Sequence, residues 1–435
     1  MDLKVKLSPN LKSAINNTGW VFGDQIVRLG IGLIVGVWIA RYLGSNEYGL
    51  LSYSMAFVAL FSPLTTLGLD SLLVRDVLHE PHKRNEILGT VLGIRCVGGL
   101  IGAILTILSI VAINQHNDRV VLLVVILSVG SIFQASNTID LWFQSQLESK
   151  HTVVAKMCVF SAITLIRLAL IYYKVGIVPF AIVNSLEMAL GCVALSIAYC
   201  RSGASLIALR WNSQLVYPML KESFPLLLSG LTIMLYMKID LIMIGQMIDT
   251  RSVGIYAAAS RLSEVWYALP VAIAASAAPS IYEGKKISEE VYYGRVKKLI
   301  GTMTWLAIII VLPMTLASDY FVTTLFGIEY KEAGSILAIH IWSSIFVFTG
   351  VATSSWFVAE GLSYLSLQRT AIGAIVNVIL NLILIPKFHG SGAAIATVVS
   401  QACASLLCNV LHPKTRKIFY LQLRPALPSF KSLSR

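Results

Sequence analysis

Charged residues are scarce in this sequence of 435 residues. Asp, Glu, Lys and Arg together make up 13% of it, hydrophobic residues make up 56%, and the mean hydropathy is +0.76. Soluble globular domains carry about 25% charged residues, and disordered chains combine high charge with few apolar residues. The composition therefore excludes both classes and indicates a membrane protein.

Motifs for catalysis and for metal binding are also lacking. The sequence has no HExxH, GxSxG or P-loop pattern, and none of its six cysteines stands in a CxxC pair. The cysteines lie in or beside apolar windows, where small packing residues are expected: Cys96, Cys158, Cys192, Cys200, Cys403 and Cys408. We therefore expect no enzyme, no bound cofactor and no metal site. The basic residues form no folded patch of the kind that binds nucleic acid.

Long polar stretches are rare, and apolar windows fill most of the chain. A helix that spans a bilayer needs about 20 apolar residues. Twelve windows reach this length, at roughly 13–41, 47–74, 86–113, 119–146, 153–173, 175–200, 219–247, 254–280, 296–317, 333–359, 363–385 and 390–411. They leave no room for a sizeable soluble domain. The sequence thus predicts an all-α polytopic membrane protein with about twelve transmembrane helices.

Lys and Arg are distributed unequally between the two ends of these windows. With the N-terminus in the cytoplasm, 23 of the 34 basic residues fall on the cytoplasmic side, 6 on the opposite side and 5 within spans. Because cytoplasmic loops carry an excess of Lys and Arg, both termini are expected in the cytoplasm. The basic tail from Lys414 to Arg435 would then lie at the anionic inner leaflet.

The longest polar interruption in the middle of the chain, about residues 201–218, divides the windows into two sets of six. We expect an N-terminal six-helix lobe over residues 1–212 and a C-terminal six-helix lobe over residues 213–435. The turns after the first and seventh windows read RYLGSNEYGLLSY and QMIDTRSVGIYAA, which places Gly49 opposite Gly254. This correspondence favours an internal duplication, a common plan in transporters that bind their substrate between two repeats.

Ionisable residues within the spans are few, and each costs on the order of 3 kcal/mol at the middle of a bilayer. They are therefore expected to face protein or water. The basic ones are Arg28, Arg95, Arg167, Lys238 and Arg261, and the carboxylates that we single out are Asp24, Asp240 and Glu264.

The spacing of these residues along the helices indicates which of them can pair within one helix. Lys238 and Asp240 are two apart and point in different directions, so at least one of them needs a partner on another helix. Two pairs stand at the spacing of helix neighbours, and each could form a local ion pair or serve a cavity: Asp24 with Arg28, and Arg261 with Glu264.

Arg95 and Arg167 have no acidic neighbour within one helical turn. Either they pair with Asp140, Glu187 or another distant carboxylate, or they form an internal cationic surface. A planar guanidinium fits a diphosphate, because it donates parallel charge-assisted hydrogen bonds. The five basic residues are therefore candidates for a substrate-binding cationic cavity, and the three acidic residues for coupling to H⁺ or Na⁺. His340, alone in its window, is expected to make an interhelical hydrogen bond.

Several stretches carry a resemblance to a known family. They are WIARYLGSNEYGLLSYSMAFV and LGLDSLLVRDV in the first half, MKIDLIMIGQMIDTRSVGIYAAASRLSEVWYALPVAIAASAAPSIYE at the start of the second half, and FGIEYKEAGSILAIHIWSSIFVFTGVATSSWFVAEGLSYLSLQRTAIGAIVNVILNLILIPKFHGSGAAIATVVSQ near the end. Through them the chain resembles the Wzx-type O-antigen and polysaccharide flippases, which are polysaccharide biosynthesis proteins of the multidrug/oligosaccharidyl-lipid/polysaccharide exporter superfamily. The resemblance covers nearly the whole chain.

The resemblance implies two six-helix lobes around a central cavity that opens alternately to the two sides of the membrane. It implies as cargo an oligosaccharide repeat unit on undecaprenyl diphosphate, moved across a bacterial inner membrane for O-antigen, capsule or exopolysaccharide synthesis. Arg28, Arg95, Lys238 and Arg261 stand at plausible equivalents of the family's basic cavity residues. Membrane lipids, a polysaccharide polymerase and a chain-length regulator would be partners, and coupling to a proton or sodium gradient would make the protein an antiporter.

Two other functions remain open. A cation-coupled exporter of small molecules or drugs belongs to the same superfamily, and its cavity is expected to be apolar or acidic. A membrane-embedded polysaccharide polymerase or ligase usually needs a large extracytoplasmic loop, whereas the loops on that side are only about 5 to 15 residues long.

Overall fold

Helices account for all regular structure in the described part of this protein. The computed structural model describes the backbone of residues 9–114 and 117–423, with side chains from residue 17 onward. These residues contain no strand. The predicted all-α fold class is confirmed.

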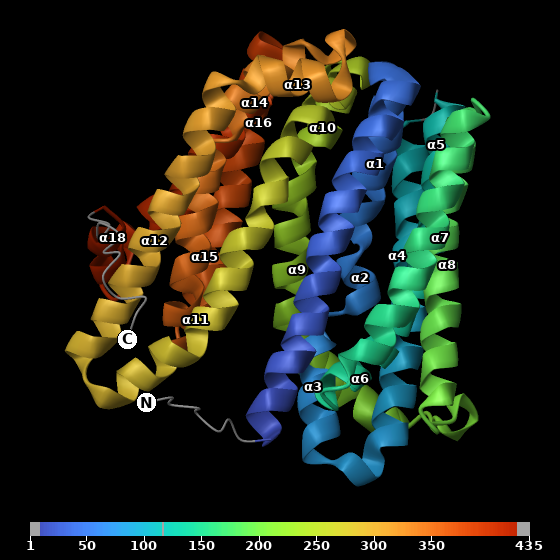
Figure 1. The fold of residues 1–435 in the computed structure, drawn as a ribbon, viewed down its shortest axis with the longest axis vertical. Helices are drawn as coiled ribbons and strands as arrows, with labels where there is room; N and C mark the ends of the chain where they lie inside the picture. Colours follow the sequence, from blue (N-terminus) through green and yellow to red (C-terminus); the bar gives the residue numbers. More distant parts are fainter. Residues whose placement is uncertain (1–8, 115–116, 424–435) are drawn as a thin grey trace, which may run out of the picture. The chain divides into compact units, whose positions relative to one another are not determined.

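The helices follow one another with short connections (Figure 1). In the first half they are α1 (Pro9–Phe61), α2 (Pro63–Thr66), α3 (Asp70–His79), α4 (Arg84–Ile113), α5 (Asp118–Ile132), α6 (Asn137–Ser145), α7 (Ser149–Tyr172), α8 (Ile177–Arg201) and α9 (Ser213–Met247). In the second half they are α10 (Thr250–Glu264), α11 (Ala268–Ile287), α12 (Glu289–Leu316), α13 (Ser318–Phe326), α14 (Glu332–His340), α15 (Ser343–Ala359), α16 (Ser363–Ala402), α17 (Cys408–Leu411) and α18 (Arg416–Leu423).

Ten helical segments among the described residues are long and apolar enough to cross a membrane. Two of them are too long for a single crossing. Asn17–His79 has 63 residues and Ser363–Leu411 has 49, and a straight helix of 63 residues would measure roughly 95 Å against a hydrocarbon layer of about 30 Å.

One helix in each of these long segments, α1 in the first and α16 in the second, contains a residue outside the helical region. Gly44 has φ 74° and ψ 169°, and His389 has φ 52° and ψ −132°. Both residues lie between two predicted windows, so α1 and α16 each consist of two helices that meet at a sharp turn. The first segment turns again at Leu67 and Gly68, before α3. The expected count of twelve spans stays a prediction, since ten continuous segments are what the described residues give.

The chain folds into two compact units. The first comprises the residues up to Tyr42 together with Ser54–Met234, and the second comprises Leu43–Tyr53 together with the residues from Leu235 onward. The boundary therefore falls inside α9, and one short segment of α1 belongs to the second unit. The predicted lobes, residues 1–212 and 213–435, stay a prediction.

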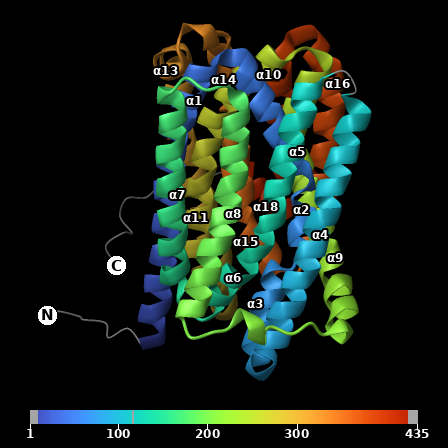
Figure 2. The same cartoon turned by 90° about the vertical axis from the view of Figure 1, so that its right-hand side faces the viewer.

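In the first unit the long helices form a row. Figure 2 shows α7, α8, α5 and α4 side by side, and α2 packs against α4. The α3 and α6 helices pack against each other below them. The buried side chains of this unit include Leu73, Val91, Trp142, Phe143 and Tyr199. These helices are apolar almost all round, as expected where one side meets protein and the other meets lipid.

In the second unit α11, α12 and α15 pack around a separate apolar core (Figure 1). Its buried side chains include Val296, Ile300, Met303, Phe348 and Trp356. The short α18 helix lies against α12. There Lys417 pairs with Glu289 at 3.7 Å, so the last described helix is fastened to the second unit.

Leu43–Tyr53 joins the second unit through a reciprocal contact of two glycines. A Cβ atom on Gly49 would stand 1.8 Å from the carbonyl oxygen of Thr250, and one on Gly254 would stand 1.9 Å from that of Ser45. Each carbonyl belongs to the residue four positions before the other glycine. The two turns that the sequence aligns thus pack against each other symmetrically, as duplicated elements do, and no larger residue fits at either glycine.

The Glu329 carboxylate fastens the same segment. Ser45 donates to its Oε1 from the hydroxyl at 2.6 Å and from the backbone N–H at 2.8 Å. These two hydrogen bonds hold the pKa of Glu329 below its usual range. The stabilisation by these two hydrogen bonds is therefore fully present at neutral pH. It is lost only as the pH falls through the lowered pKa of Glu329.

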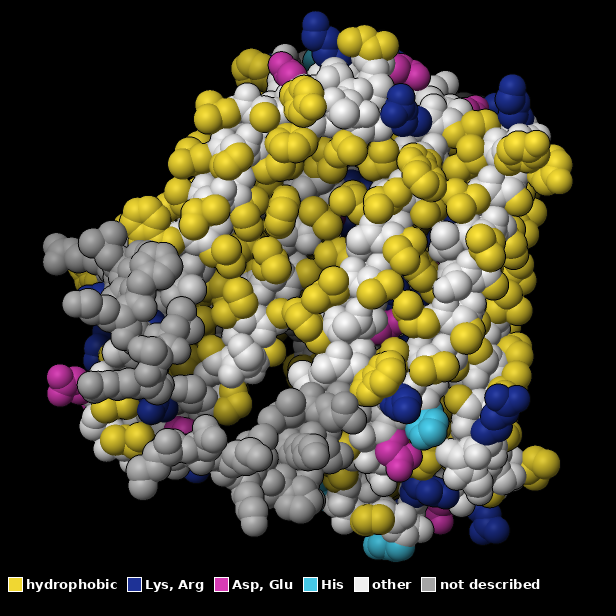
Figure 3. Space-filling model, in the orientation of Figure 1, with side chains coloured by type: hydrophobic (Ala, Val, Ile, Leu, Met, Phe, Trp, Pro, Cys, Tyr) yellow, Lys and Arg dark blue, Asp and Glu magenta, His cyan; other side chains and the backbone are white. Residues whose placement is uncertain are grey.

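Large apolar side chains remain exposed within the long helices. Leu108, Leu165 and Ile309 are 61%, 67% and 64% exposed. On the face drawn in Figure 3, hydrophobic side chains cover the helices while charged side chains gather toward their ends. Such extensive apolar exposure is unfavourable in water, so these surfaces face lipid and the protein is a multi-pass membrane protein.

Candidate functional site

A buried polar cluster in the second unit surrounds the carboxylate of Asp240 on α9. Tyr256 on α10 donates a hydrogen bond to Asp240 Oδ2 at 2.7 Å, and Thr397 donates to the same oxygen at 2.5 Å. Asn381 donates to Oδ1 from its amide at 2.6 Å. Asn381 and Thr397 lie on either side of the turn at His389, so the break in α16 brings both halves of that helix to one carboxylate.

The cluster supplies Asp240 with neutral donors and with no cation. Asp240 is only 5% exposed, and no Lys or Arg among the described residues forms an ion pair with it. A buried charge without a counter-charge costs on the order of several kcal/mol. Either a proton or a bound monovalent cation would remove that cost.

Further oxygen atoms are available beside the carboxylate. The Oδ1 atom of Asn381 is buried and accepts no hydrogen bond from a described residue. Asn377 lies next to it and accepts a hydrogen bond from the Asn381 amide at 3.1 Å. The adjoining space measures about 20 Å³, enough for one water-sized guest. Asp240 and Thr397 line this space and Asn381 does not; the oxygens of Asp240 and Thr397 are of the hard kind that a Na⁺ ion accepts.

Lys238 and Glu264 form the charged edge of the same region. Lys238 Nζ lies 3.6 Å from Glu264 Oε2, and both side chains are 28% exposed. The prediction that Lys238 or Asp240 has a partner on another helix is therefore confirmed. Arg261 lies half-buried on α10, one turn before Glu264.

His340 makes no interhelical hydrogen bond with a described residue through its Nδ1 atom, and the expectation for its other ring nitrogen stays a prediction. Its Nδ1 atom is buried and has no hydrogen-bond partner among the described residues. The imidazole packs edge-on against the ring of Tyr256, with the centroids 5.8 Å apart and the planes at 82°. An aromatic contact therefore helps to hold His340 in place.

In the first unit two predicted basic residues pair with carboxylates at the expected places. Arg28 Nε donates to Asp24 on the same helix at 2.7 Å. Arg167 on α7 pairs with Glu187 on α8 at 2.7 Å and also donates to Asn184 at 2.6 Å. Both local and distant pairing, two of the alternatives that spacing leaves open, therefore occur.

Arg95 on α4 pairs with a carboxylate that spacing does not single out. Its guanidinium donates to Asp70 at the start of α3 and, at 3.4 Å, to Thr138 on α6. The Arg95 side chain is 1% exposed, whereas that of Asp70 is 59% exposed. Arg95 thus lies inside the first unit, and Asp140, the other predicted partner, pairs with Lys156 at 2.6 Å.

The five predicted basic residues are divided between the two units. Arg28, Arg95 and Arg167 belong to the first unit, and Lys238 and Arg261 to the second. Four of the five are neutralised by carboxylates in this structure. The cationic cavity stays a prediction.

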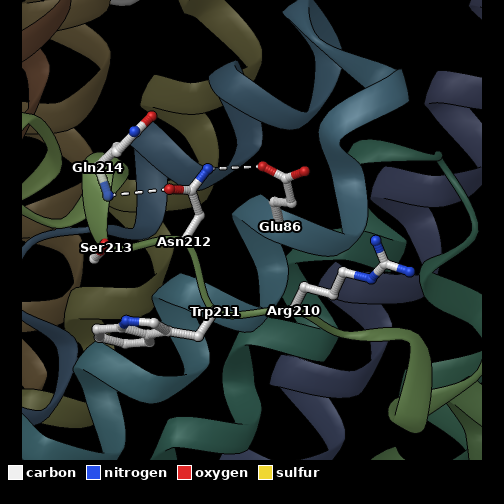
Figure 4. Close-up of a pocket in the computed structure, with 6 residues that line it drawn as sticks. All are labelled: Glu86, Arg210, Trp211, Asn212, Ser213 and Gln214. Carbon is white, nitrogen blue, oxygen red and sulfur yellow. Dashed lines mark hydrogen bonds between the residues drawn. The ribbon is translucent and has the colours of Figure 1, made fainter.

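A larger pocket of about 350 Å³ lies in the first unit (Figure 4). Asn212 donates from its side chain to Glu86 at 2.8 Å and from its backbone to Thr90 at 2.9 Å. Gly89 on α4 allows this approach, since a Cβ there would stand 2.5 Å from the carbonyl oxygen of Arg210. These contacts fasten the linker before α9 to the start of α4. Because Asn212 ties the linker to Glu86 and Thr90 on α4, the pocket is best explained as a structural clamp.

The residues around Asp240 are those that sequence reasoning missed. Tyr256, Asn377, Asn381 and Thr397 escape notice because none is charged. A signal was present, since Asn377 and Asn381 are two amides one helical turn apart inside an apolar window. Paired amides are uncommon in a bilayer unless they have partners on other helices.

Comparison with known proteins gives a consistent result. The family model described as polysaccharide biosynthesis protein matches residues 14–285. The probable flippase AglR of Haloferax volcanii is 25% identical to this chain over 413 residues, which cover 90% of the chain and 82% of AglR.

Two solved structures share the fold. The lipid II flippase MurJ in an inward closed conformation is similar with a TM-score of 0.72 and 17% identity, over 93% of this chain and 90% of MurJ. A multidrug resistance MATE family transporter of the MOP superfamily, in its inward-facing conformation, is similar with a TM-score of 0.69 and 16% identity, over 92% of this chain and 96% of the transporter. At these identities the likeness concerns the fold alone.

Proposed function

This chain belongs to the polysaccharide biosynthesis protein family, and we propose that it is a flippase that moves a lipid-linked oligosaccharide repeat unit from one leaflet of its membrane to the other. The family match over residues 14–285 carries the proposal. The named relatives are flippases and transporters, and the chain is accordingly a membrane transporter and not an enzyme.

The finer assignment follows the sequence-based expectations. The cargo would be an oligosaccharide on undecaprenyl diphosphate, and the product would serve O-antigen, capsule or exopolysaccharide synthesis. The protein would lie in a bacterial inner membrane with both termini in the cytoplasm, as the 23 to 6 division of Lys and Arg favours. A polysaccharide polymerase and a chain-length regulator would act on the translocated unit.

The physical task is to carry a glycan and a diphosphate through about 30 Å of hydrocarbon that solvates neither. Arg28, Arg95, Arg167, Lys238 and Arg261 are proposed to contact the diphosphate. Since four of these are paired with carboxylates, we infer that the diphosphate oxygens replace carboxylate oxygens when cargo binds. This exchange keeps these four basic residues compensated in both states.

Asp240 is the proposed coupling residue, with Asp24 and Glu264 as the other candidates. Asp24 and Glu264 already face a basic partner, whereas Asp240 faces neutral donors only. A proton or a Na⁺ ion arriving at Asp240 would change the charge of a buried cluster formed by α9, α10 and α16. The proton or Na⁺ ion would then bind one conformation of the transporter more tightly than the other. This difference in binding free energy lets an ion gradient drive the protein between the two conformations.

A reconstituted assay tests the flippase proposal. The purified full chain is placed in proteoliposomes that contain an undecaprenyl-diphosphate-linked oligosaccharide, and a membrane-impermeant glycosidase measures the exposed glycan. We expect the glycosidase to cleave nearly all of the glycan lipid in vesicles that contain the protein. In vesicles without the protein it should cleave only the glycan lipid of the outer leaflet. Equal cleavage in the two preparations, across proton and sodium gradients of either direction, would reject the proposal.

The second candidate is a cation-coupled exporter of small molecules, which the fold shared with a multidrug resistance transporter supports. The same vesicles distinguish the two functions. Gradient-dependent transport of a lipophilic cationic dye, without any change in glycan exposure, would favour the exporter.

A further inference from the structure

Arg369 lies in a pocket of the second unit that none of the predicted site residues lines. The pocket has a volume of about 170 Å³ and is formed by α15, α16, α17 and the turn before α18. Arg369 and Gln368 provide polar groups from the start of α16, and His412 provides another from the turn. Ile372 and Leu411 add apolar surface. The pocket therefore has both a polar and an apolar wall.

The contacts of the Arg369 guanidinium are all with neutral groups. It donates to the hydroxyl of Thr353 at 3.1 Å and to the carbonyl oxygen of Gly350 at 3.3 Å, and its Cζ atom lies 4.3 Å from the ring centroid of Phe357. No Asp or Glu among the described residues forms an ion pair with it. Of all Asp and Glu residues in the sequence, only Asp2 lies outside the described part.

This arrangement distinguishes Arg369 from the intramembrane arginines of the first unit. Arg28, Arg95 and Arg167 each face a carboxylate. Arg369 is likewise half-buried within a candidate span, yet it has hydrogen-bond acceptors without negative charge. Because a guanidinium retains its proton at any physiological pH, the missing compensation has to come from an anion.

Donors remain free for such an anion. Two of the five guanidinium N–H groups are used, so Arg369 keeps others that can form a charge-assisted pair. His412 Nδ1 accepts a hydrogen bond from the Lys414 backbone at 3.3 Å, which leaves Nε2 as the protonated nitrogen of a neutral ring. The Gln368 side chain is exposed and makes no hydrogen bond with a described residue.

The depth of Arg369 in the bilayer and the volume of the pocket limit the class of ligand that the pocket can bind. Arg369 lies six residues into α16, roughly 9 Å from the helix start, and the polar zone of a bilayer is about 5 to 7 Å deep on each side. By these lengths Arg369 lies just inside the hydrocarbon boundary, next to the layer that holds the lipid phosphates. At about 170 Å³, the pocket is smaller than the roughly 300 Å³ at which drug-sized ligand sites begin, so it suits a headgroup and not an oligosaccharide.

We propose that this pocket binds the phosphate group of an anionic phospholipid, with Arg369 as the phosphate ligand and with an acyl chain along Ile372 and Leu411. The guanidinium fork receives the phosphate oxygens, and His412 and Gln368 supply neutral donors. The exposed side chains of Ile372 and Leu411, 37% and 70% accessible, lie where the chain leaves the pocket. The site is separate from the proposed cargo contacts and does not depend on them.

Native mass spectrometry of the purified full chain tests this site with dioleoyl phosphatidylglycerol and dioleoyl phosphatidylcholine as probes. We expect one phosphatidylglycerol per chain to be retained about tenfold more strongly than phosphatidylcholine. Arg369→Gln should abolish this preference, since it removes the charge-assisted pair. Arg295→Gln is the matched control, because Arg295 is in the same unit but donates to the Ser280 carbonyl outside the pocket, and it should retain the preference.

A second variant keeps the proposal testable if Arg369→Gln fails to fold. Gln368→Glu adds a negative charge at the exposed wall and leaves every contact of Arg369 in place, and it should reduce phosphatidylglycerol retention severalfold. Equal retention of the two lipids by the wild-type chain, or undiminished preference in both variants, would overturn the proposal. Arg369-dependent stabilisation by inorganic phosphate, with no preference between the lipids, would assign the site to free phosphate and would also overturn it.

Discussion

The Asp240 carboxylate is held by a hydroxyl from each of two residues and by one amide, and by no cation. We predict that Asp240→Asn reduces gradient-driven transport about tenfold or more, because an amide can neither take up a proton nor attract a cation. Glycan exposure in proteoliposomes under an imposed gradient measures the effect. Asp118→Asn, an exposed substitution of the same chemistry at the start of α5, is the control and should transport normally.

The amount of Asp240→Asn protein that reaches the membrane distinguishes a coupling role of Asp240 from a structural role. Asp240→Asn should reach the membrane at a near-normal level, since the amide preserves the shape of the cluster. Joint loss of abundance and transport would identify a structural carboxylate, and unchanged transport would eliminate coupling through Asp240. Thr397→Val removes one oxygen and keeps the carboxylate, so it should raise the cation concentration needed for half-maximal transport.

Arg167 and Glu187 allow the proposed exchange of carboxylate for diphosphate to be tested. Arg167→Ala should lower the affinity for the lipid-linked oligosaccharide about tenfold or more, because the charge-assisted pair is lost. Glu187→Gln should retain or increase that affinity, since it frees Arg167 from a competing carboxylate at 2.7 Å. Binding of the glycan lipid to the purified variants measures both effects. Equal losses in the two variants would show that the pair only holds α7 against α8.

Residue pairing could be predicted only in part, both within a helix and between helices: Glu264, three residues after Arg261 on the same helix, pairs with Lys238 on another helix. The Asp24–Arg28 pair follows from a spacing of four, and Glu187 was one of two carboxylates predicted for Arg167. Asp70 could not be singled out as the partner of Arg95, because helices that are apolar all round give no signal for their rotation. For the same reason, the sequence does not reveal that Asn381 and Thr397 meet at Asp240.

At the level of whole elements, the sequence predicts the turns more reliably than the continuity of the helices. Gly44 and His389 both fall between predicted windows, but the helices on either side meet without an intervening loop. Gly44 itself takes the positive φ in RYLGSNEYG. In FHGSG the positive φ falls on His389, and Gly392 allows the close approach of the Leu384 carbonyl. That Leu43–Tyr53 belongs to the second unit could not be predicted, since hydropathy does not encode which neighbours an apolar segment selects.

The reciprocal glycine contact gives a prediction for these elements. Gly49→Ala and Gly254→Ala should each lower the melting temperature of the purified protein, because the added Cβ atom would stand within 2 Å of a backbone carbonyl oxygen and such overpacking costs about 1–3 kcal/mol. Gly32→Ala is the control on α1, where a Cβ atom meets nothing within 4 Å, and it should leave the melting temperature unchanged or raise it. Melting temperatures of Gly49→Ala and Gly254→Ala that match that control would contradict the contact.

For the whole molecule, composition alone indicates a membrane protein, whereas orientation depends on the distribution of 34 basic residues. Residues within the long helices, such as Leu165 and Ile309, are exposed as lipid-facing side chains should be. The orientation itself cannot be read from exposure, because both ends of the helices carry polar residues. Only the excess of Lys and Arg on one side distinguishes the ends.

That excess predicts the accessibility of five positions. Asn10 and Ser429 should be cytoplasmic, and Asn46, Asn117 and Asp249 should face the opposite side; Ser429 lies outside the described residues. All six native cysteines are free, so they can be replaced before single cysteines are introduced at these positions. A membrane-impermeant maleimide added to intact cells should label positions 46, 117 and 249 and should label 10 and 429 only after lysis.

Because an even number of crossings returns the chain to its starting side, labelling of 10 without 429 in intact cells would imply an odd number of crossings. Labelling of both termini, with 46, 117 and 249 protected, would invert the orientation.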